Sequence, residues 1–261
     1  YERAVYIFTC SPEQIEPMRR IGFWHVEHLP FAADLRLFRP LELSEADRAR
    51  HGARVCFMGT PLIDNPIDGY DYLQKKMRTQ MATAQPGDAE ACRRILLLLD
   101  ELVETHRGDF SNCRIAELMQ ALETKHKVML LEEGMTPIKD TWAILLGVHL
   151  SMVQRLDVVR ALAPLGIAVY GPEDWRKAPI EGMQYRGQVA HGEELAKVIN
   201  AAEINVNVSK IMFPSGVGPR LFETLACGGF LLSNTNPAIL STFVEGRDFV
   251  AYYGLADLKD K

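Results

Sequence analysis

The sequence predicts an α/β fold built on a parallel sheet, with a helical insertion in the middle of the chain. Short runs of branched and aromatic residues alternate with helical patterns near both ends of the chain, which is typical of strand–helix–strand units. Between about residues 70 and 163, apolar residues recur only at helical spacing. With 261 residues, the chain can bury one large core or two modest ones.

The first 40 residues predict one strand–helix–strand unit and a linker. Ser11-Pro12 provides an N-cap and a proline for the first turn of a helix, where the missing N–H costs nothing. Two prolines interrupt the stretch after the second strand, so we expect a linker there. The expected bounds are 5–8 and 23–28 for the strands, 11–22 for the helix and 29–40 for the linker.

Residues 41–261 predict further strand–helix units. Ser44 and Asp47 have the spacing of a capping box, in which two residues satisfy each other's backbone N–H groups at a helix start. Glycines follow several strands, and the carboxyl ends of parallel strands meet at one edge of a sheet, so we expect these glycines at that edge. The expected strands are 54–58, 166–170, 183–186, 204–208, 230–232 and 248–252, and the expected helices include 193–202, 237–244 and one that begins at Pro219.

Four helices are expected in the insertion of about residues 70–163. Turn residues separate them, among them the run Gln85-Pro-Gly-Asp88. A cofactor-binding bundle would need a pair of Glu-x-x-His motifs or a histidine pair, and the insertion has neither, so an insertion that shields the sheet or contacts a partner is favoured. The expected helices are 70–81, 89–106, 113–125 and 137–163.

Composition narrows the class of protein. A net charge of −5 argues against a nucleic-acid partner, because neutralising phosphates needs a basic surface. No apolar run approaches ~18 residues, so we expect no transmembrane segment. Five cysteines at irregular spacings predict free thiols in a reducing cytoplasm. No metal-ligand spacing is present, so neither a metal nor a cofactor is expected.

The most informative stretch is 203–234, EINVNVSKIMFPSGVGPRLFETLACGGFLLSN. It predicts a strand, a loop with Gly216 and Gly218, a helix that begins at Pro219, and a second strand. The helix N-terminus offers unpaired N–H groups to an anion such as a pyrophosphate. Glu223 can reach back from the second turn and accept hydrogen bonds from both hydroxyls of a ribose. From the pattern alone, a solvated glutamate is equally expected there.

Within this stretch, GVGPRLFETLACGGFLLSN resembles the donor-site motif of GT-B glycosyltransferases, and it is most similar to the CgeB-like (spore-maturation protein) branch. The resemblance covers both ends of the chain and leaves about 70–151 uncovered. It implies a Rossmann-like donor domain at 41–261 that contains the insertion, preceded at 1–40 by the end of an N-terminal, acceptor-side domain and the linker. Four further stretches match in family order: HLPFAADLRLFRP (28–40), VCFMG (55–59), VYGPEDW (169–175) and YRGQV (185–189).

The resemblance implies a transferase that moves a sugar from a UDP- or GDP-sugar to a hydroxyl of a glycan, protein or small-molecule acceptor, without a metal. Glu223 would bind the donor ribose, and Arg220 would stabilise the charge of the leaving group. The other implied contacts are Gly216, Val217, Gly218 and Leu221 at the diphosphate, backbone near Gly59 and Thr60, and Gly171, Tyr185 and Gly187 at the nucleobase.

Two positions depart from the family pattern. Many retaining relatives have a second glutamate eight positions before the first, beside the reacting sugar, and this chain has Ser215 at that catalytic position. Relatives supply an arginine after the first strand of the donor domain, where this chain has Thr60. Arg220 could bind a diphosphate or pair with a structural carboxylate. A non-catalytic nucleotide-sugar-binding or assembly protein and a nucleotide-sugar epimerase stay open as alternative functions.

Overall fold

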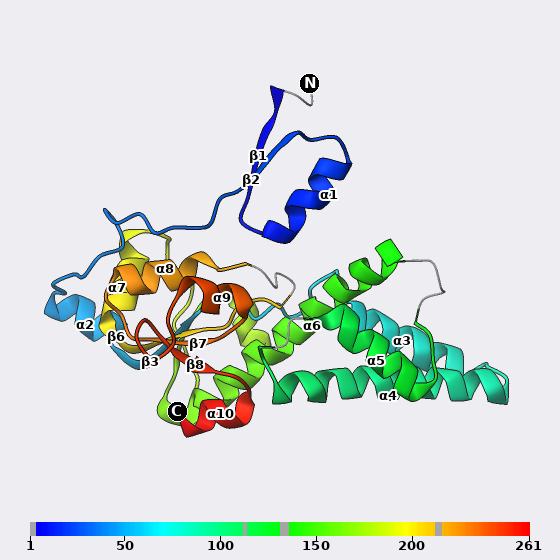
Figure 1. The fold of residues 1–261 in the computed structure, drawn as a ribbon. Helices are drawn as coiled ribbons and strands as arrows, with labels where there is room; N and C mark the ends of the chain where they lie inside the picture. The colour runs from blue at the N-terminus through cyan, green and yellow to red at the C-terminus, as the bar shows by residue number, and fades with distance from the viewer. Residues whose placement is uncertain (1–3, 112–113, 131–135, 212–215) are drawn as a thin grey trace.

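The computed structural model describes residues 4–111, 114–130, 136–211 and 216–261 and contains two separate parallel sheets (Figure 1). The smaller sheet has two strands, β1 (Tyr6–Thr9) and β2 (His25–His28). Between them lie a 3-10 turn and the helix α1 (Ile15–Arg20), which begins later than the predicted Ser11 because its first residues form that turn. The predicted strand–helix–strand unit is therefore present.

The segment after β2 crosses helices of the larger unit and is fixed there. Phe38 is almost fully buried beside Leu195 and Ile199 of helix α7 (Glu193–Ala201). The Asn200 side chain donates to the carbonyl of Arg39 and accepts from the N–H of Leu41. These contacts hold the chain between the small unit and the large sheet.

The larger sheet has six parallel strands in the order β5-β4-β3-β6-β7-β8. Counted along the chain from β3, this order is 3-2-1-4-5-6, the doubly wound arrangement whose switch point lies between the first and fourth strands. The switch point of this protein is therefore between β3 and β6. The strands are β3 (Ala53–Met58), β4 (Ala168–Tyr170), β5 (Gln184–Tyr185), β6 (Ala202–Asn207), β7 (Leu231–Asn234) and β8 (Val250–Tyr252).

Helices cover both faces of the sheet. Alternation along β3 sends Val55 and Phe57 to one face and Cys56 and Met58 to the other, as a two-residue period requires. The first face packs on α6 (Thr136–Leu162) and α10 (Leu255–Asp260). The second face is covered by α2 (Glu45–His51), α7 and α8 (Pro219–Ala226), with α9 (Pro237–Thr242) beside them.

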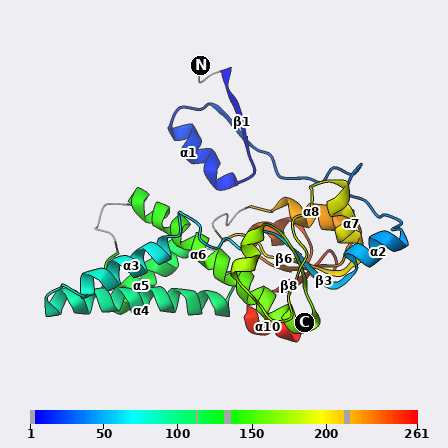
Figure 2. The ribbon, with the colours of Figure 1, turned by 180° about the vertical axis from the view of Figure 1, so that it is seen from behind.

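The insertion forms a helical arm beside the sheet (Figure 2). Its helices are α3 (Gly69–Met81), α4 (Pro86–Gly108), α5 (Ile115–His126) and the first half of α6, and they enclose a core of their own that includes Leu98, Leu102 and Leu146. Helix α4 begins three residues before the predicted start, because Pro86 is accepted at the first helical position. The second half of α6 leaves the arm and packs on the sheet.

Residues 141–165, most of α6, are long and apolar enough to cross a membrane by length and composition. Their most apolar window is 67% buried inside the protein, as in the core helix of a folded domain. No transmembrane segment was expected, because no uninterrupted apolar run approaches ~18 residues, although a helix was predicted at 137–163.

The predicted α/β fold with a parallel sheet and a helical insertion is confirmed. The capping box at α2 is also present, because the Ser44 hydroxyl accepts from the N–H of Asp47 and the Asp47 carboxylate accepts from the N–H of Ser44. Several strands are shorter than predicted, and β5 contains only Gln184 and Tyr185.

Candidate functional site

A cavity of about 500 Å³ lies at the switch point of the sheet. It is bounded by the ends of β3 and β6, the start of α8, one residue of α6 and the small N-terminal unit. The strand ends β3 and β6 are neighbours in the sheet, so their loops diverge and leave a crevice, as is usual for this topology. The lining residues are Cys10, Ser11, Gln14, Phe31, Phe57, Met58, Gly59, Thr60, Arg155, Asn207, Val208, Ser209, Lys210, Gly216, Val217, Gly218, Pro219 and Arg220.

The start of α8 offers backbone to the cavity. Gly218 is the N-cap and Pro219 the first helical residue, so the helix begins where the sequence predicts. A Cβ at Gly218 would meet nothing within 4 Å, which leaves its backbone open to a ligand. The unpaired N–H groups and the positive end of the helix dipole favour an anion at this place.

Arg155 of α6 is the most unusual side chain in the cavity. It is 6% exposed, and its guanidinium donates to the carbonyls of Thr60 (2.6 Å) and Val208 (3.3 Å), which follow the two strands of the switch point. Burial lowers its pKa to about 10. Its Nε atom is buried without a hydrogen-bond partner, and in the described part of the chain no carboxylate forms an ion pair with it. A buried cation without a counter-charge is costly unless an anion binds it.

Lys210 adds a second positive charge at the rim of the cavity. It follows β6 by three residues, and partial burial together with the charge of Arg155 lowers its pKa. Arg220, at the start of α8, also lines the cavity, and burial lowers its pKa. Three basic side chains therefore surround the N-terminus of α8, so an anionic ligand suits the cavity.

A buried polar network fixes the loop after β6. The Asn207 amide donates to the hydroxyls of Ser233 (2.9 Å) and Ser209 (3.0 Å). The N–H of Ser209 donates to the Asn234 side chain (2.7 Å), and the Tyr252 hydroxyl donates to the carbonyl of Asn207 (2.9 Å). The network places Ser209 and Lys210 on a rigid base, as a preorganised site requires.

Glu223 is buried close to the cavity but does not line it. One carboxylate oxygen accepts from Arg220 Nη1 (2.8 Å) and the other lies 2.8 Å from Nε2 of His191. Glu223 is only 3% exposed. Of the two partners that the sequence left open for Arg220, a diphosphate or a carboxylate, the structure shows the carboxylate, and the Arg220 side chain also lines the cavity wall.

The glycines after the strands meet at one edge, as predicted. The N–H of Gly59 donates to the carbonyl of Tyr170, and the N–H of Gly171 donates to the carbonyl of Gly187. The Tyr185 hydroxyl donates to the Gly171 carbonyl (3.1 Å). Gly59 and Thr60 line the cavity, whereas Gly171, Tyr185 and Gly187 brace one another outside its lining.

Of the remaining predicted site residues, some line the cavity and others do not. Gly216, Val217 and Gly218 line the cavity. Leu221 is fully buried in the core beneath α8, so only its backbone belongs to the helix start. Ser215 lies outside the described residues.

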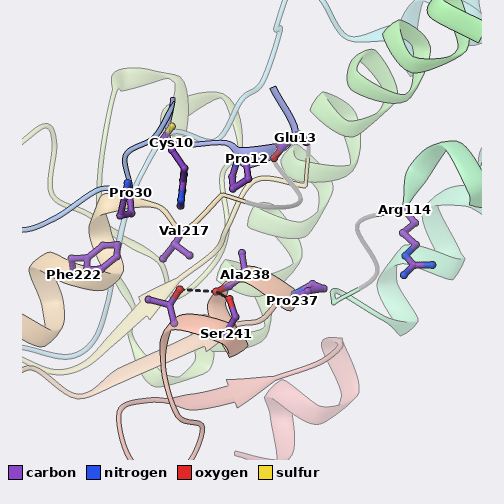
Figure 3. Close-up of a pocket in the computed structure, with 12 residues that line it drawn as sticks. Cys10, Pro12, Glu13, Pro30, Arg114, Val217, Phe222, Pro237, Ala238 and Ser241 are labelled. Atoms are coloured by element: carbon purple, nitrogen blue, oxygen red, sulfur yellow. Dashed lines mark hydrogen bonds between the residues drawn. The ribbon is translucent and has the colours of Figure 1, made fainter. Parts of the chain in front are cut away.

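A second cavity of about 480 Å³ shares Cys10 and Val217 with the first. Figure 3 shows Cys10, Pro12, Glu13 and Pro30 of the N-terminal unit on one side and residues of α8 and α9 on the other. Its wall is largely apolar, with Phe222, Pro237 and Ala238 among the lining residues. The two cavities together form a crevice between the small unit and the large sheet.

Sequence reasoning missed Arg155, Lys210 and His191. In the sequence, Arg155 looks like one more charged residue of a long helix. The two carbonyls that hold its side chain in the cavity are 95 and 53 positions away in the chain. The asparagines and serines at the carboxyl ends of β6 and β7 were the available signal, because ligands bind at this edge of a doubly wound sheet. Within the described ranges, no group of three or more His, Cys, Asp or Glu side chains is arranged to hold a metal ion.

The part of the chain that resembles a known protein family is also the part that forms most of the cavity. Residues 153–261 match a family model described as glycosyl transferase-like. The match covers Arg155, the strands from β4 to β8 and the whole of α8, and so includes most of the cavity wall outside the N-terminal unit. No curated protein and no solved structure matches the chain. Residues 153–261 are therefore similar to a glycosyl transferase-like domain.

Proposed function

We propose that this protein transfers a sugar from a nucleotide-diphosphate sugar, with uridine or guanosine as the nucleoside, to an acceptor hydroxyl. The observation that carries the proposal is the buried guanidinium of Arg155 beside the N-terminus of α8, which pairs with no carboxylate among the described residues. The glycosyl transferase-like match over residues 153–261 supports the class of reaction. A diphosphate brings the negative charge that this cavity is built to accept.

In the proposed reaction, the bond between the anomeric carbon and the diphosphate oxygen breaks, and the electron pair leaves with the nucleoside diphosphate. The acceptor hydroxyl forms the new bond to the anomeric carbon and gives its proton to the departing diphosphate. Arg155, Lys210 and the N–H groups at the start of α8 would stabilise the charge that develops on the leaving group. The crevice toward Phe222 and Pro237 would hold the acceptor, because it opens from the same cavity.

The finer assignments belong to the same proposal. Glu223 would bind the ribose of the donor, and the loops that end in Gly171 and Gly187 would face the nucleobase. The proposal also includes the resemblance to the CgeB-like branch, a cytoplasmic location and a reaction without a metal. The acceptor class is proposed as a glycan, a protein or a small molecule.

A binding experiment with Arg155→Gln tests the proposal. We expect UDP or GDP to bind the parent protein and to bind this variant about 10- to 100-fold more weakly, the range for a lost charge-assisted hydrogen bond. The control is Arg160→Gln on the same helix, which is half-exposed and pairs with Asp157. Lys210→Met serves as a second variant at the exposed rim, where folding is not at risk.

Turnover separates transfer from binding alone. The full-length protein is incubated with UDP- and GDP-sugars, and release of the nucleoside diphosphate is measured with and without candidate acceptors. Release that depends on Arg155 supports the transferase. Tight binding without release favours a nucleotide-sugar-binding protein, and equal affinity of the parent and Arg155→Gln contradicts the proposed site.

A further inference from the structure

The contact between His191 and Glu223 covers a carboxylate that the proposed function needs. Glu223 Oε1 lies 2.8 Å from His191 Nε2, and the Glu223 side chain is only 4% exposed. A ribose hydroxyl must approach one of these oxygens closely in order to donate to it. Some group that covers Glu223 therefore has to move before a ribose can bind.

Of the two side chains that hold this carboxylate, His191 is the one that can leave. The His191 side chain is 68% exposed, whereas that of Arg220 is 25% exposed and closely packed at the start of α8. His191 follows β5 in an irregular segment that ends at Gly192, and its ring lies against the buried Phe38 with 5.3 Å between the ring centres. Rotating an exposed ring into water buries no polar group and opens no core.

Both ends of this segment contain glycine in a backbone conformation that other residues rarely adopt. Gly187 has φ of +80° and Gly192 has φ of +103°. Positive φ values cost little at glycine, so these positions can absorb a change in the path of the segment. Of the intervening residues, Gln188 and Ala190 are exposed, and Val189 is the one that packs against the core and opposes the movement.

We propose that His191 is a gate residue that competes with the donor ribose for Glu223. In the closed state its Nε2–H occupies Oε1, and in the open state a ribose hydroxyl donates to the same oxygen. This inference rests on the proposed function, because it assumes that Glu223 binds the donor nucleoside. An internal competitor weakens the apparent affinity, because only the fraction of protein with an open gate can bind the ribose.

The test compares nucleotide affinity of the parent and His191→Ala. We expect His191→Ala to bind UDP or GDP about 3- to 10-fold more tightly, because the competing hydrogen bond has been removed. A 2′,3′-dideoxynucleoside diphosphate should show no gain, since it has no hydroxyl to offer Glu223. Gln188→Ala, an exposed change in the same segment, is the matched control and should leave affinity unchanged.

Two further outcomes decide between the gate and the proposed function. If UDP or GDP binds through Arg155 but His191→Ala binds it equally or more weakly, the gate is wrong and the donor site stands. If inorganic pyrophosphate binds with the same affinity to the parent and to Arg155→Gln, the donor site itself is wrong. Failure of both the parent and His191→Ala to bind any nucleotide contradicts both proposals.

Combining the changes gives a last check. In a Glu223→Gln background, His191→Ala should add nothing, because an amide holds neither the histidine nor the ribose as the carboxylate does. A gain of affinity that persists without Glu223 would show that His191 acts elsewhere, and would overturn the gate.

Discussion

The indole Nε1–H of Trp175 donates to the carbonyl of Gly59 at 2.8 Å, and this bond ties the segment after β4 to the end of β3. Trp175 is fully buried, and its ring meets that of Phe57 edge to face. The bond fixes the backbone at Gly59, in the first loop of the cavity, through a contact within the protein. Trp175 is thus a packing residue.

Trp175→Phe keeps most of the apolar volume and removes the donor. We expect the free energy of unfolding to fall by about 1–3 kcal/mol, because the buried Gly59 carbonyl loses its partner. Chemical denaturation at neutral pH measures this change. Tyr185→Phe, which removes a half-buried hydroxyl from the Gly171 carbonyl, is the comparison and should cost less. A Trp175→Phe protein as stable as the parent would contradict this role.

Gly171 stands where no side chain fits. A Cβ there would lie 2.2 Å from the Gly59 carbonyl oxygen and 2.8 Å from Trp175 Nε1. We expect Gly171→Ala to destabilise the fold by about 1–3 kcal/mol or more, because backbone on both sides must shift.

The matched control for this change is Gly87→Ala in the first turn of α4, where a Cβ meets nothing within 4 Å. Alanine favours a helix over glycine by roughly 0.5–1 kcal/mol, so this variant should gain stability. Thermal unfolding of the two variants side by side distinguishes them, and equal melting temperatures would refute the steric argument.

His106 makes the free energy of unfolding depend on pH. It is 2% exposed, and burial lowers its pKa to about 4 from a reference of 6.5. The unfolded chain therefore takes up a proton between pH 6.5 and about 4 while the folded chain resists, so stability falls as pH decreases through this window. The shift corresponds to ~3 kcal/mol at most.

Denaturation at pH 7 and at pH 4.5 measures this loss. His106→Gln cannot titrate, so we expect a smaller difference between the two pH values than in the parent. An identical pH dependence in the parent and His106→Gln would exclude His106 as its source.

Asp157 of α6 joins the helical arm to the sheet. It accepts from Arg107 of α4 (2.7 Å) and from Arg160 (3.0 Å), and it is 7% exposed. We expect Asp157→Asn to lower the free energy of unfolding by about 1–3 kcal/mol, since both charge-assisted bonds weaken.

Glu104→Gln is the control for this pair, because Glu104 contacts the same Arg107 from an exposed position. Its expected effect is within about 0.5 kcal/mol. Urea denaturation of both variants provides the comparison. An equal loss in the two would mean that burial of Asp157 adds nothing.

Local signals in the sequence were sufficient for much of the fold. Pro219 after Gly218 marked the start of α8, and the Ser44–Asp47 spacing marked that of α2, because caps depend on neighbours a few residues apart. The short β5 was overestimated. Only two of its residues pair with β4, and sequence alone does not show where a neighbouring strand stops.

The site was less accessible to sequence reasoning because it depends on distant pairings. Nothing near Arg155 announces that the carbonyls of Thr60 and Val208 will face it. Likewise, the pattern around Glu223 gave its place in the helix but not His191, which is 32 positions away. The assignment of Glu223 to a ribose therefore stays a prediction that the binding experiments address.

Helix α6 serves both the arm and the sheet without a break over its 27 residues, and Met152 contacts the cores of both. Each residue of an α-helix turns the chain by about 100°. Adding or deleting one residue between Leu150 and Arg155 would point the guanidinium away from the strand ends or turn the arm's apolar side to water. This stretch of helix therefore has a fixed number of residues, because both the cavity and the core of the arm depend on its register.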